Sequence, residues 1–203
     1  MNIVRKKLAV FFPGIGYTLD KPLMHYSRRI AADLGYETLL LPYSGFPPKV
    51  KGDKERMQES FRIALEQSEK MLSETDLYSY ADVLFVGKSI GTAVAAKIAS
   101  ESPCQDWIRL VCYTPLEETF SYEFGDAIVF SGRADPWVGG AKSRIAELAS
   151  KRDYLCYLIA GANHSLESGD VLQDIRNMAE IMQITEQFMK GNIEELYEGG
   201  AFR

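Results

Sequence analysis

The chain has few histidines and cysteines, and this scarcity narrows the kinds of site that it can build. Its 203 residues include two histidines, His25 and His164, and three cysteines, Cys104, Cys112 and Cys156. Because the histidines lie far apart in the sequence and no two cysteines have C-x-x-C spacing, we expect no metal site. Cys112 and Cys156 lie in apolar runs, where cysteine usually acts as a small buried hydrophobe, so we expect structural thiols in a reducing compartment.

Long apolar runs and a strong net charge are also missing. The apolar stretch at 8–12 is too short for a signal peptide, and no stretch approaches the ~18 apolar residues of a membrane span. The formal net charge of −5 argues against nucleic acid and anionic membrane surfaces as partners. We therefore expect a cytoplasmic protein.

The composition is that of a single folded domain. Hydrophobic residues make up 46% and charged residues 25% of the chain, which is ordinary for a protein with a substantial core. The length fits one domain over residues 1–203, and no repeat, low-complexity stretch or linker interrupts it. The polar ending NIEELYEGGAFR indicates that the last few residues are loosely held.

Six short apolar runs alternate with segments of helical periodicity. We expect strands in LAVFF (8–12), ETLLLPY (37–43), DVLFVG (82–87), WIRLVCY (107–113), DAIVFSG (126–132) and DYLCYLIAG (153–161). Helices are predicted over 21–34, 54–72, 90–101 and 140–152, and near the C-terminus, where a stripe is formed by Val171, Ile175, Met178, Met182 and Phe188. The alternation predicts an α/β fold: a mostly parallel sheet of about six strands with helices on both faces.

The segments that follow the apolar runs lie at the edge where a parallel sheet binds its ligands. They are PGIGYT (13–18), SGFPP (44–48), KSIG (88–91), TPLEE (114–118), RADPW (133–137) and ANHSLE (162–167). A serine hydroxyl becomes a nucleophile when a histidine takes its proton and a third group orients that histidine. These segments contain such a set in Ser89, His164 and Asp135, whereas His25 falls in a predicted helix and is interpreted as structural. Other aspartates begin their strands and belong at the opposite edge: Asp82, Asp126 and Asp153.

The sequence around the serine resembles that of the α/β-hydrolase family. Residues 87–91 read G-K-S-I-G between a strand and a helix, like the family's G-x-S-x-G nucleophile elbow, and Ser89, Asp135 and His164 follow its chain order. The resemblance covers nearly the whole chain, is of the small dienelactone-hydrolase and carboxylesterase type, and implies a catalytic triad of these three residues. The elbow glycines would make room for the strained serine turn. In some relatives the acid follows the preceding strand, where Glu117 and Glu118 stand as alternatives to Asp135.

The resemblance also implies an oxyanion hole and an open site. The two donors would be the backbone N–H groups of Ile90 and Ile15. Gly16 is the alternative to Ile15, because Pro13-Gly14 stands where many family members have His-Gly. Only residues 114–125 are available where the family inserts a lid, so no cap domain is expected. Chemistry of this kind needs no cofactor.

Several side chains near this edge could shape the pocket. We expect Tyr17 and Trp137 to bind substrate. Lys88 could lie near the mouth of the site and attract an acidic substrate, or it could point to solvent. The same two possibilities apply to Arg133. Further candidates for an apolar wall are Met24, Tyr43, Phe46 and Leu116.

The resemblance thus favours a serine hydrolase that cleaves an ester or thioester of a small-molecule substrate. Amidase, peptidase and C–C hydrolase activities are further possibilities, and the fold leaves the acyl group and the oligomeric state open. The alternative is a catalytically inactive ligand-binding or interaction protein on the same scaffold. A nucleotide-binding protein would need a glycine-rich phosphate loop, which the sequence does not contain.

Overall fold

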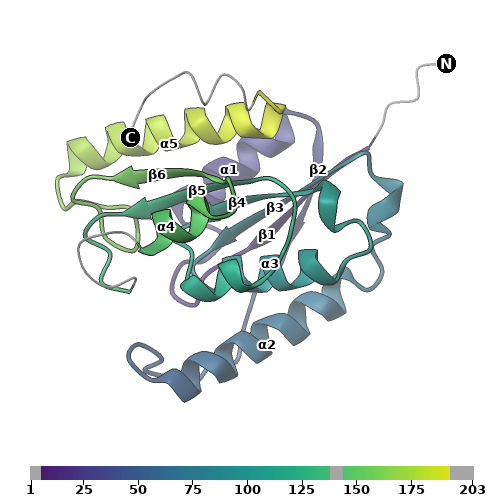
Figure 1. Ribbon diagram of the computed structural model, residues 1–203, viewed down its shortest axis with the longest axis horizontal. Helices are drawn as coiled ribbons and strands as arrows, with labels where there is room; N and C mark the ends of the chain where they lie inside the picture. The colour runs from purple at the N-terminus through teal and green to yellow at the C-terminus, as the bar shows by residue number, and fades with distance from the viewer. Residues whose placement is uncertain (1–5, 138–143, 193–203) are drawn as a thin grey trace.

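Strands and helices alternate along the chain, as Figure 1 shows. The computed structural model describes residues 6–137 and 144–192. Its strands are β1 (Lys7–Phe12), β2 (Tyr36–Leu40), β3 (Asp82–Lys88), β4 (Ile108–Tyr113), β5 (Ala127–Gly132) and β6 (Leu155–Ile159). Its α-helices are α1 (Pro22–Asp33), α2 (Lys54–Leu72), α3 (Ile90–Glu101), α4 (Arg144–Ser150) and α5 (Val171–Lys190).

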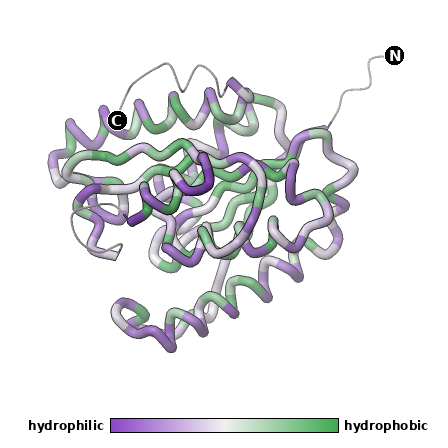
Figure 2. The backbone as a smooth tube through the Cα atoms, in the orientation of Figure 1, coloured by the Kyte–Doolittle hydropathy of each residue, from purple (hydrophilic) through white to green (hydrophobic). Residues whose placement is uncertain are grey.

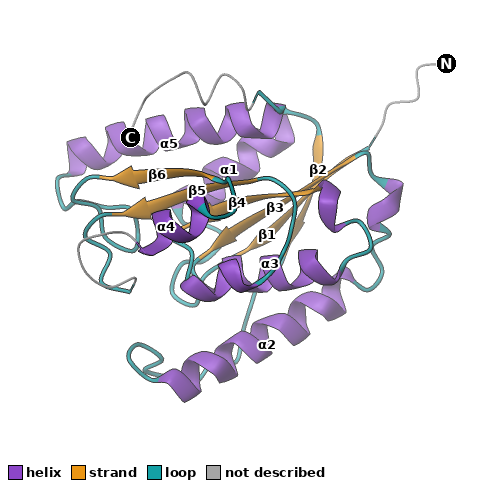
Figure 3. Ribbon diagram, viewed as in Figure 1, coloured by secondary structure: helices purple, strands orange, loops and turns teal. Residues whose placement is uncertain are grey.

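The six strands form one sheet in the order β2-β1-β3-β4-β5-β6. Every neighbouring pair is parallel, so all strand ends of one kind lie at the same edge, as the arrows in Figure 3 show. The predicted parallel sheet of about six strands is therefore confirmed. This arrangement brings the segments after β3, β5 and β6 to a common edge.

Helices cover both faces of the sheet, as predicted. Alternate residues of each strand point to opposite faces: in β1, Val10 packs in a cluster with α2, α3 and α4, while Phe11 packs in a second cluster with α1 and α5. Figure 2 shows the hydrophobic residues concentrated along the central strands, with polar residues on the outer faces of the helices. The strands read as continuous apolar runs because both of their faces are buried.

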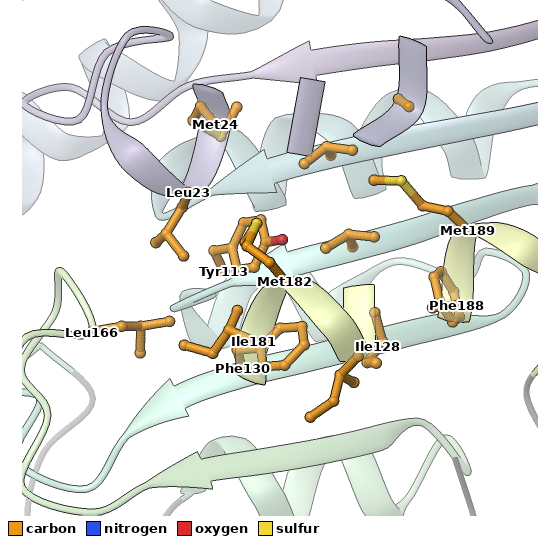
Figure 4. Close-up of a cluster of buried hydrophobic side chains, with 14 of the residues drawn as sticks. Leu23, Met24, Tyr113, Ile128, Phe130, Leu166, Ile181, Met182, Phe188 and Met189 are labelled. Atoms are coloured by element: carbon orange, nitrogen blue, oxygen red, sulfur yellow. The ribbon is translucent and has the colours of Figure 1, made fainter. Parts of the chain in front are cut away.

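The second cluster joins α5 to the middle of the sheet. Figure 4 shows Ile181 and Met182 of α5 beside Tyr113 and Phe130 of the sheet, with Leu23 of α1 across from them. The rings of Tyr113 and Phe130 stack with centroids 5.4 Å apart. This packing fixes the positions of the strands that carry the functional edge.

Most element boundaries follow the local sequence. Helix α2 covers the predicted 54–72, and Asp53 caps it by accepting the N–H of Arg56 at 3.0 Å. Strand β2 ends at Leu40, before the end of the run at 37–43, because Pro42 has no N–H for the ladder. The helix predicted over 140–152 is described over Arg144–Ser150, since 138–143 lie outside the described residues. The loosely held ending falls within 193–203 and lies outside them too.

The C-terminal helix departs from the stripe read in the sequence. Met182 and Phe188 pack into the core, but Val171 and Ile175 are 71% and 61% exposed. The hydrophobic contacts of α5 with the core begin at Met178. The first turns of the helix therefore carry apolar side chains outside the core.

The connection between β4 and β5 contains no cap domain, as expected. A single 3₁₀ helix, Glu117–Ser121, occupies it. Within the described part of the chain, no helix is long and apolar enough to cross a membrane.

Candidate active site

Ser89 occupies a strained turn between β3 and α3. Its backbone has φ 55° and ψ −124°, a region that non-glycine residues rarely enter and that costs of order 1–3 kcal/mol. The N–H of Ser89 donates to the carbonyl oxygen of Tyr113 at 3.0 Å, which ties the turn to β4. Surrounding structure therefore holds the serine in a conformation that the chain would not adopt alone.

The two elbow glycines allow this turn to pack. A Cβ on Gly91 would lie 2.1 Å from the carbonyl oxygen of Phe12, and one on Gly87 would lie 2.7 Å from the Cα of Thr92. Both distances are far below a van der Waals contact, and both involve backbone atoms that cannot move aside. Any side chain at either position would push β1 or α3 away from the serine.

Ser89, His164 and Asp135 form a continuous hydrogen-bonded chain. The Nε2 atom of His164 lies 2.8 Å from Ser89 Oγ, and its Nδ1 atom lies 2.7 Å from Asp135 Oδ2. Because an ionised carboxylate only accepts hydrogen bonds, Nδ1 carries the proton and Nε2 can accept the serine O–H. The other Asp135 oxygen accepts the N–H of Trp137 at 2.9 Å. The Asp135 side chain is 0% and that of His164 18% exposed, so this chain of bonds is largely shielded from water.

The loop that carries His164 is fixed by two residues that the sequence analysis did not single out. The hydroxyl of Thr114 donates to the carbonyl oxygen of His164 at 3.0 Å. Gly132, the last residue of β5, lets the loop approach, because a Cβ there would lie 2.1 Å from the carbonyl oxygen of Ala162. Both residues stand at the ends of strands β4 and β5, so the edge argument could have included them.

Burial controls the electrostatics of the histidine. Loss of hydration lowers the pKa of His164, and the positive charges of Lys88 and Lys51 lower it further. The hydrogen bond and the charge of Asp135 act in the opposite direction. The net result is a neutral imidazole at neutral pH, which is the form that can accept a proton.

Lys88 lines the pocket beside Ser89 but is enclosed, so it does not point to solvent. Its side chain is 1% exposed, and its Nζ lies 5.0 Å from the centroid of the Tyr17 ring. Burial lowers the pKa of Lys88 to about 7, while the charge of Asp135 partly offsets this effect. The loop at 13–18 covers the end of β3 and encloses this lysine.

A pocket of about 250 Å³ opens beside Ser89. The two predicted substrate-binding residues, Tyr17 and Trp137, line it, and the Trp137 ring lies 5.3 Å from that of His164. Met57, in the helix predicted over 54–72, and Ser165 also line the pocket, although neither was expected to bind substrate. The other wall candidates do not line it, because Met24, Tyr43 and Phe46 pack in or against the hydrophobic core and Leu116 is buried elsewhere.

Both candidate oxyanion donors lie at this pocket. Ile90 is the first residue of α3, and Ile15 belongs to the loop after β1. Within residues 6–137 and 144–192, neither backbone N–H donates to another group of the protein. Gly16 lines the pocket as well, so it remains the alternative to Ile15. Gly14 brings this loop close to the serine, since a Cβ on it would lie 3.4 Å from Ser89 Cβ.

The alternative residues lie elsewhere. Glu117 pairs with Arg144 at 3.4 Å, and the carboxylate bonded to His164 is that of Asp135. His25 lies on α1 with its ring 5.2 Å from that of Tyr26. The pocket beside Ser89 is not lined by Glu118 or Arg133. Among the described residues, no group of three or more His, Cys, Asp or Glu side chains could hold a metal ion.

Comparison with known proteins identifies the fold. No protein-family model matches the sequence, and no curated protein matches it significantly. Est1E from Butyrivibrio proteoclasticus, solved with ferulic acid bound, is similar with a TM-score of 0.64 and 14% identity over 94% of this chain and 90% of its own. An α/β serine hydrolase without a lid from Xanthomonas campestris is similar with a TM-score of 0.56 and 14% identity, over 92% of this chain and 81% of its own. An α/β serine hydrolase homologue from Coxiella burnetii is similar with a TM-score of 0.59 and 16% identity, over 88% of this chain and 84% of its own. The chain therefore has the α/β-hydrolase fold without a lid.

Proposed function

We propose that the protein is a serine hydrolase that cleaves an ester or thioester of a small-molecule substrate. The observation that carries the proposal is the hydrogen-bonded chain from Ser89 through His164 to Asp135, which opens into a pocket. The likeness to α/β hydrolases supports it. The pocket volume of about 250 Å³ favours a small acyl group.

The reaction follows from the positions of these groups. Ser89 Oγ attacks the carbonyl carbon while His164 Nε2 takes its proton, and Asp135 stabilises the imidazolium that forms. The N–H groups of Ile90 and Ile15 donate to the oxyanion. His164 then gives the proton to the leaving alcohol or thiol, which departs and leaves an ester on Ser89. Water then attacks this ester while His164 takes a proton from it, and His164 passes that proton to Ser89 Oγ as the acid is released.

Labelling with a fluorophosphonate probe tests the proposal. The probe phosphonylates an activated serine and needs no knowledge of the substrate. We expect the intact mass of the wild type to rise by one probe per chain, and that of Ser89→Ala and His164→Ala to stay unchanged. Ser165→Ala is the matched control, because Ser165 lines the same pocket without contacting His164 Nε2 and should leave labelling intact.

The opposite result is equally informative. A folded wild-type protein that takes up no probe would contradict the hydrolase mechanism and favour the inactive binding protein. If the wild type is labelled, untreated enzyme would next be tested with p-nitrophenyl esters and acyl thioesters of increasing chain length. Hydrolysis lost in Ser89→Ala would establish the activity.

A further inference from the structure

Lys88 is a charged residue that directly follows the uncharged, buried stretch 83–87 of its strand. Residues of β3 alternate between the two faces, and Leu84 and Val86 pack in the cluster beneath α1 and α5. Lys88 follows them in the same alternation and ends with its ammonium group over the Tyr17 ring. Enclosing an ammonium group in this way is unfavourable unless another group compensates its charge.

The protein itself provides little compensation. Within the described residues, no carboxylate lies within ion-pair distance of Lys88 Nζ and no acceptor forms a hydrogen bond with it. Asp135 attracts the ammonium group from a distance. Its two oxygens are already bonded to His164 and to the N–H of Trp137. The three N–H bonds of Lys88 thus remain available to another acceptor.

The Lys88 ammonium group also reaches the pocket. Lys88 lines the pocket together with Ser89 and His164. The Lys88 Nζ atom lies 5.0 Å from the centroid of the Tyr17 ring, which also lines the pocket, and its charge acts on His164. A ligand in the pocket could accept its hydrogen bonds.

A role for Lys88 as the catalytic base does not fit the geometry. The base position is taken by His164 Nε2 at 2.8 Å from Ser89 Oγ, and no hydrogen bond joins Lys88 Nζ to that hydroxyl within the described structure. A cation that faces a pocket and lacks an anionic partner is suited to bind an anion.

We propose, on the basis of the hydrolase function above, that Lys88 binds a carboxylate of the substrate and that the enzyme prefers esters or thioesters whose acyl group carries this second, free carboxylate. Hemiesters of short dicarboxylic acids are the simplest members of this class. The carboxylate would accept hydrogen bonds from Nζ while the scissile carbonyl lies at Ser89. Lys51, whose Nζ lies 5.8 Å from the centroid of the Trp137 ring, adds positive charge on the same side.

The preference should depend on pH in a defined direction. The pKa of Lys88 is about 7, so the protonated, anion-binding form predominates below that value and is lost as the pH rises through it. The groups that face or act on this ammonium are Asp135, His164 and the Tyr17 ring, and Lys51 acts on His164. A bound carboxylate would raise the pKa of Lys88, because it favours the charged form.

Two p-nitrophenyl esters of matched shape test the preference. The hemiglutarate ester carries a carboxylate where the hexanoate ester carries an ethyl group. For the wild type we expect a higher kcat/KM for the hemiglutarate, and we expect Lys88→Met to lower that value at least about tenfold, mainly through KM. The hexanoate value should change less than about threefold. Lys70→Met, which removes the same charge from the exposed end of α2, should leave both values unchanged.

A binding measurement separates this proposal from the hydrolase function. Ser89→Ala retains the pocket and Lys88, and its binding of monomethyl glutarate can be measured by calorimetry without turnover. We expect binding at about pH 6 that weakens at least about fivefold by about pH 8.5 and is lost in Ser89→Ala/Lys88→Met. This pH comparison holds even if the Lys88 variant fails to fold.

Each outcome bears on one proposal or the other. Absence of binding to Ser89→Ala at either pH would overturn the role of Lys88, whether or not the wild type hydrolyses esters. Binding together with an unlabelled wild type would uphold the anion site and overturn the hydrolase function. Equal kcat/KM for the two esters in wild type and in Lys88→Met would also overturn the preference.

Discussion

Strand β3 has a cluster of polar, hydrogen-bonded side chains at each end. At its start, Asp82 accepts two hydrogen bonds from Arg109, both 2.9 Å long, and also bonds to the hydroxyl of Tyr36. Arg109 continues to the last turn of α5, where it donates to the carbonyl oxygen of Met189 at 3.2 Å. This cluster ties β2, β3, β4 and α5 together.

The cluster beyond the other end of β3 is built differently. Ser89 has an unfavourable backbone conformation, Lys88 is enclosed without a carboxylate partner among the described residues, and the site opens into a pocket. At Asp82 the carboxylate is paired with the Arg109 guanidinium, whereas beside Ser89 the Lys88 ammonium has no carboxylate partner among the described residues. A paired aspartate alone therefore does not distinguish the two ends, whereas backbone strain at Ser89 and the pocket beside it do.

The largest expected effect is the loss of labelling in Asp135→Asn, at the candidate site beyond the end of β3. The amide would favour the wrong tautomer of His164, and we expect the rate of fluorophosphonate labelling to fall about 10³- to 10⁴-fold. The free energy of unfolding should change little, because asparagine has nearly the same shape. Thermal denaturation is the control, and a labelling rate within tenfold of the wild type would argue that another group orients His164.

Asp82→Asn makes the same substitution at the start of β3. We expect it to lower the stability of the fold and to leave fluorophosphonate labelling nearly unchanged. Loss of the charge leaves Arg109 partly buried without its partner, so we expect the free energy of unfolding to fall by about 1–3 kcal/mol. Denaturant titration measures this change. The labelling rate should stay within about twofold, and a large loss of labelling would erase the distinction between the two ends.

The smallest effect is a shift of the pH profile. Labelling requires neutral His164 and is lost as the pH falls through its pKa, which is lowered, so the midpoint should lie below the ordinary value of 6.5. Lys88→Met removes one positive charge that lowers this pKa, and the midpoint should move upward. Asp82→Asn serves as the control and should leave it in place. A downward shift in Lys88→Met would contradict the electrostatic argument.

Much of this architecture could be predicted from the sequence because it depends on local patterns. The run at 82–87 indicates a strand buried on both faces, and the apolar period over 54–72 gives a helix whose bounds the structure reproduces. The edge rule then places Ser89, Asp135 and His164 together although they are far apart in the chain. The structure brings these three into contact, while their catalytic roles remain a prediction.

Other features could not be predicted from the sequence, because they depend on contacts between segments that are distant in the chain. The burial of Lys88 requires the loop at 13–18 to fold over the end of β3. The pairing of Asp82 with Arg109 requires β4 to lie beside β3 in one register, in which Arg109 stands opposite Leu84. Gly132 looks like an ordinary strand residue until the loop after β6 approaches it. Each of these is a tertiary contact without a local signal.

The positions of Ser89, Asp135 and His164 along the chain determine when the three residues can first meet during synthesis. Ser89 leaves the ribosome early, but its partner His164 follows 75 residues later, and Asp135 precedes His164 by 29. A nascent chain that ends before β6 holds a serine whose hydroxyl has no proton acceptor. Under the proposed function, the serine would therefore gain its proton acceptor only once the segment after β6 has reached Ser89.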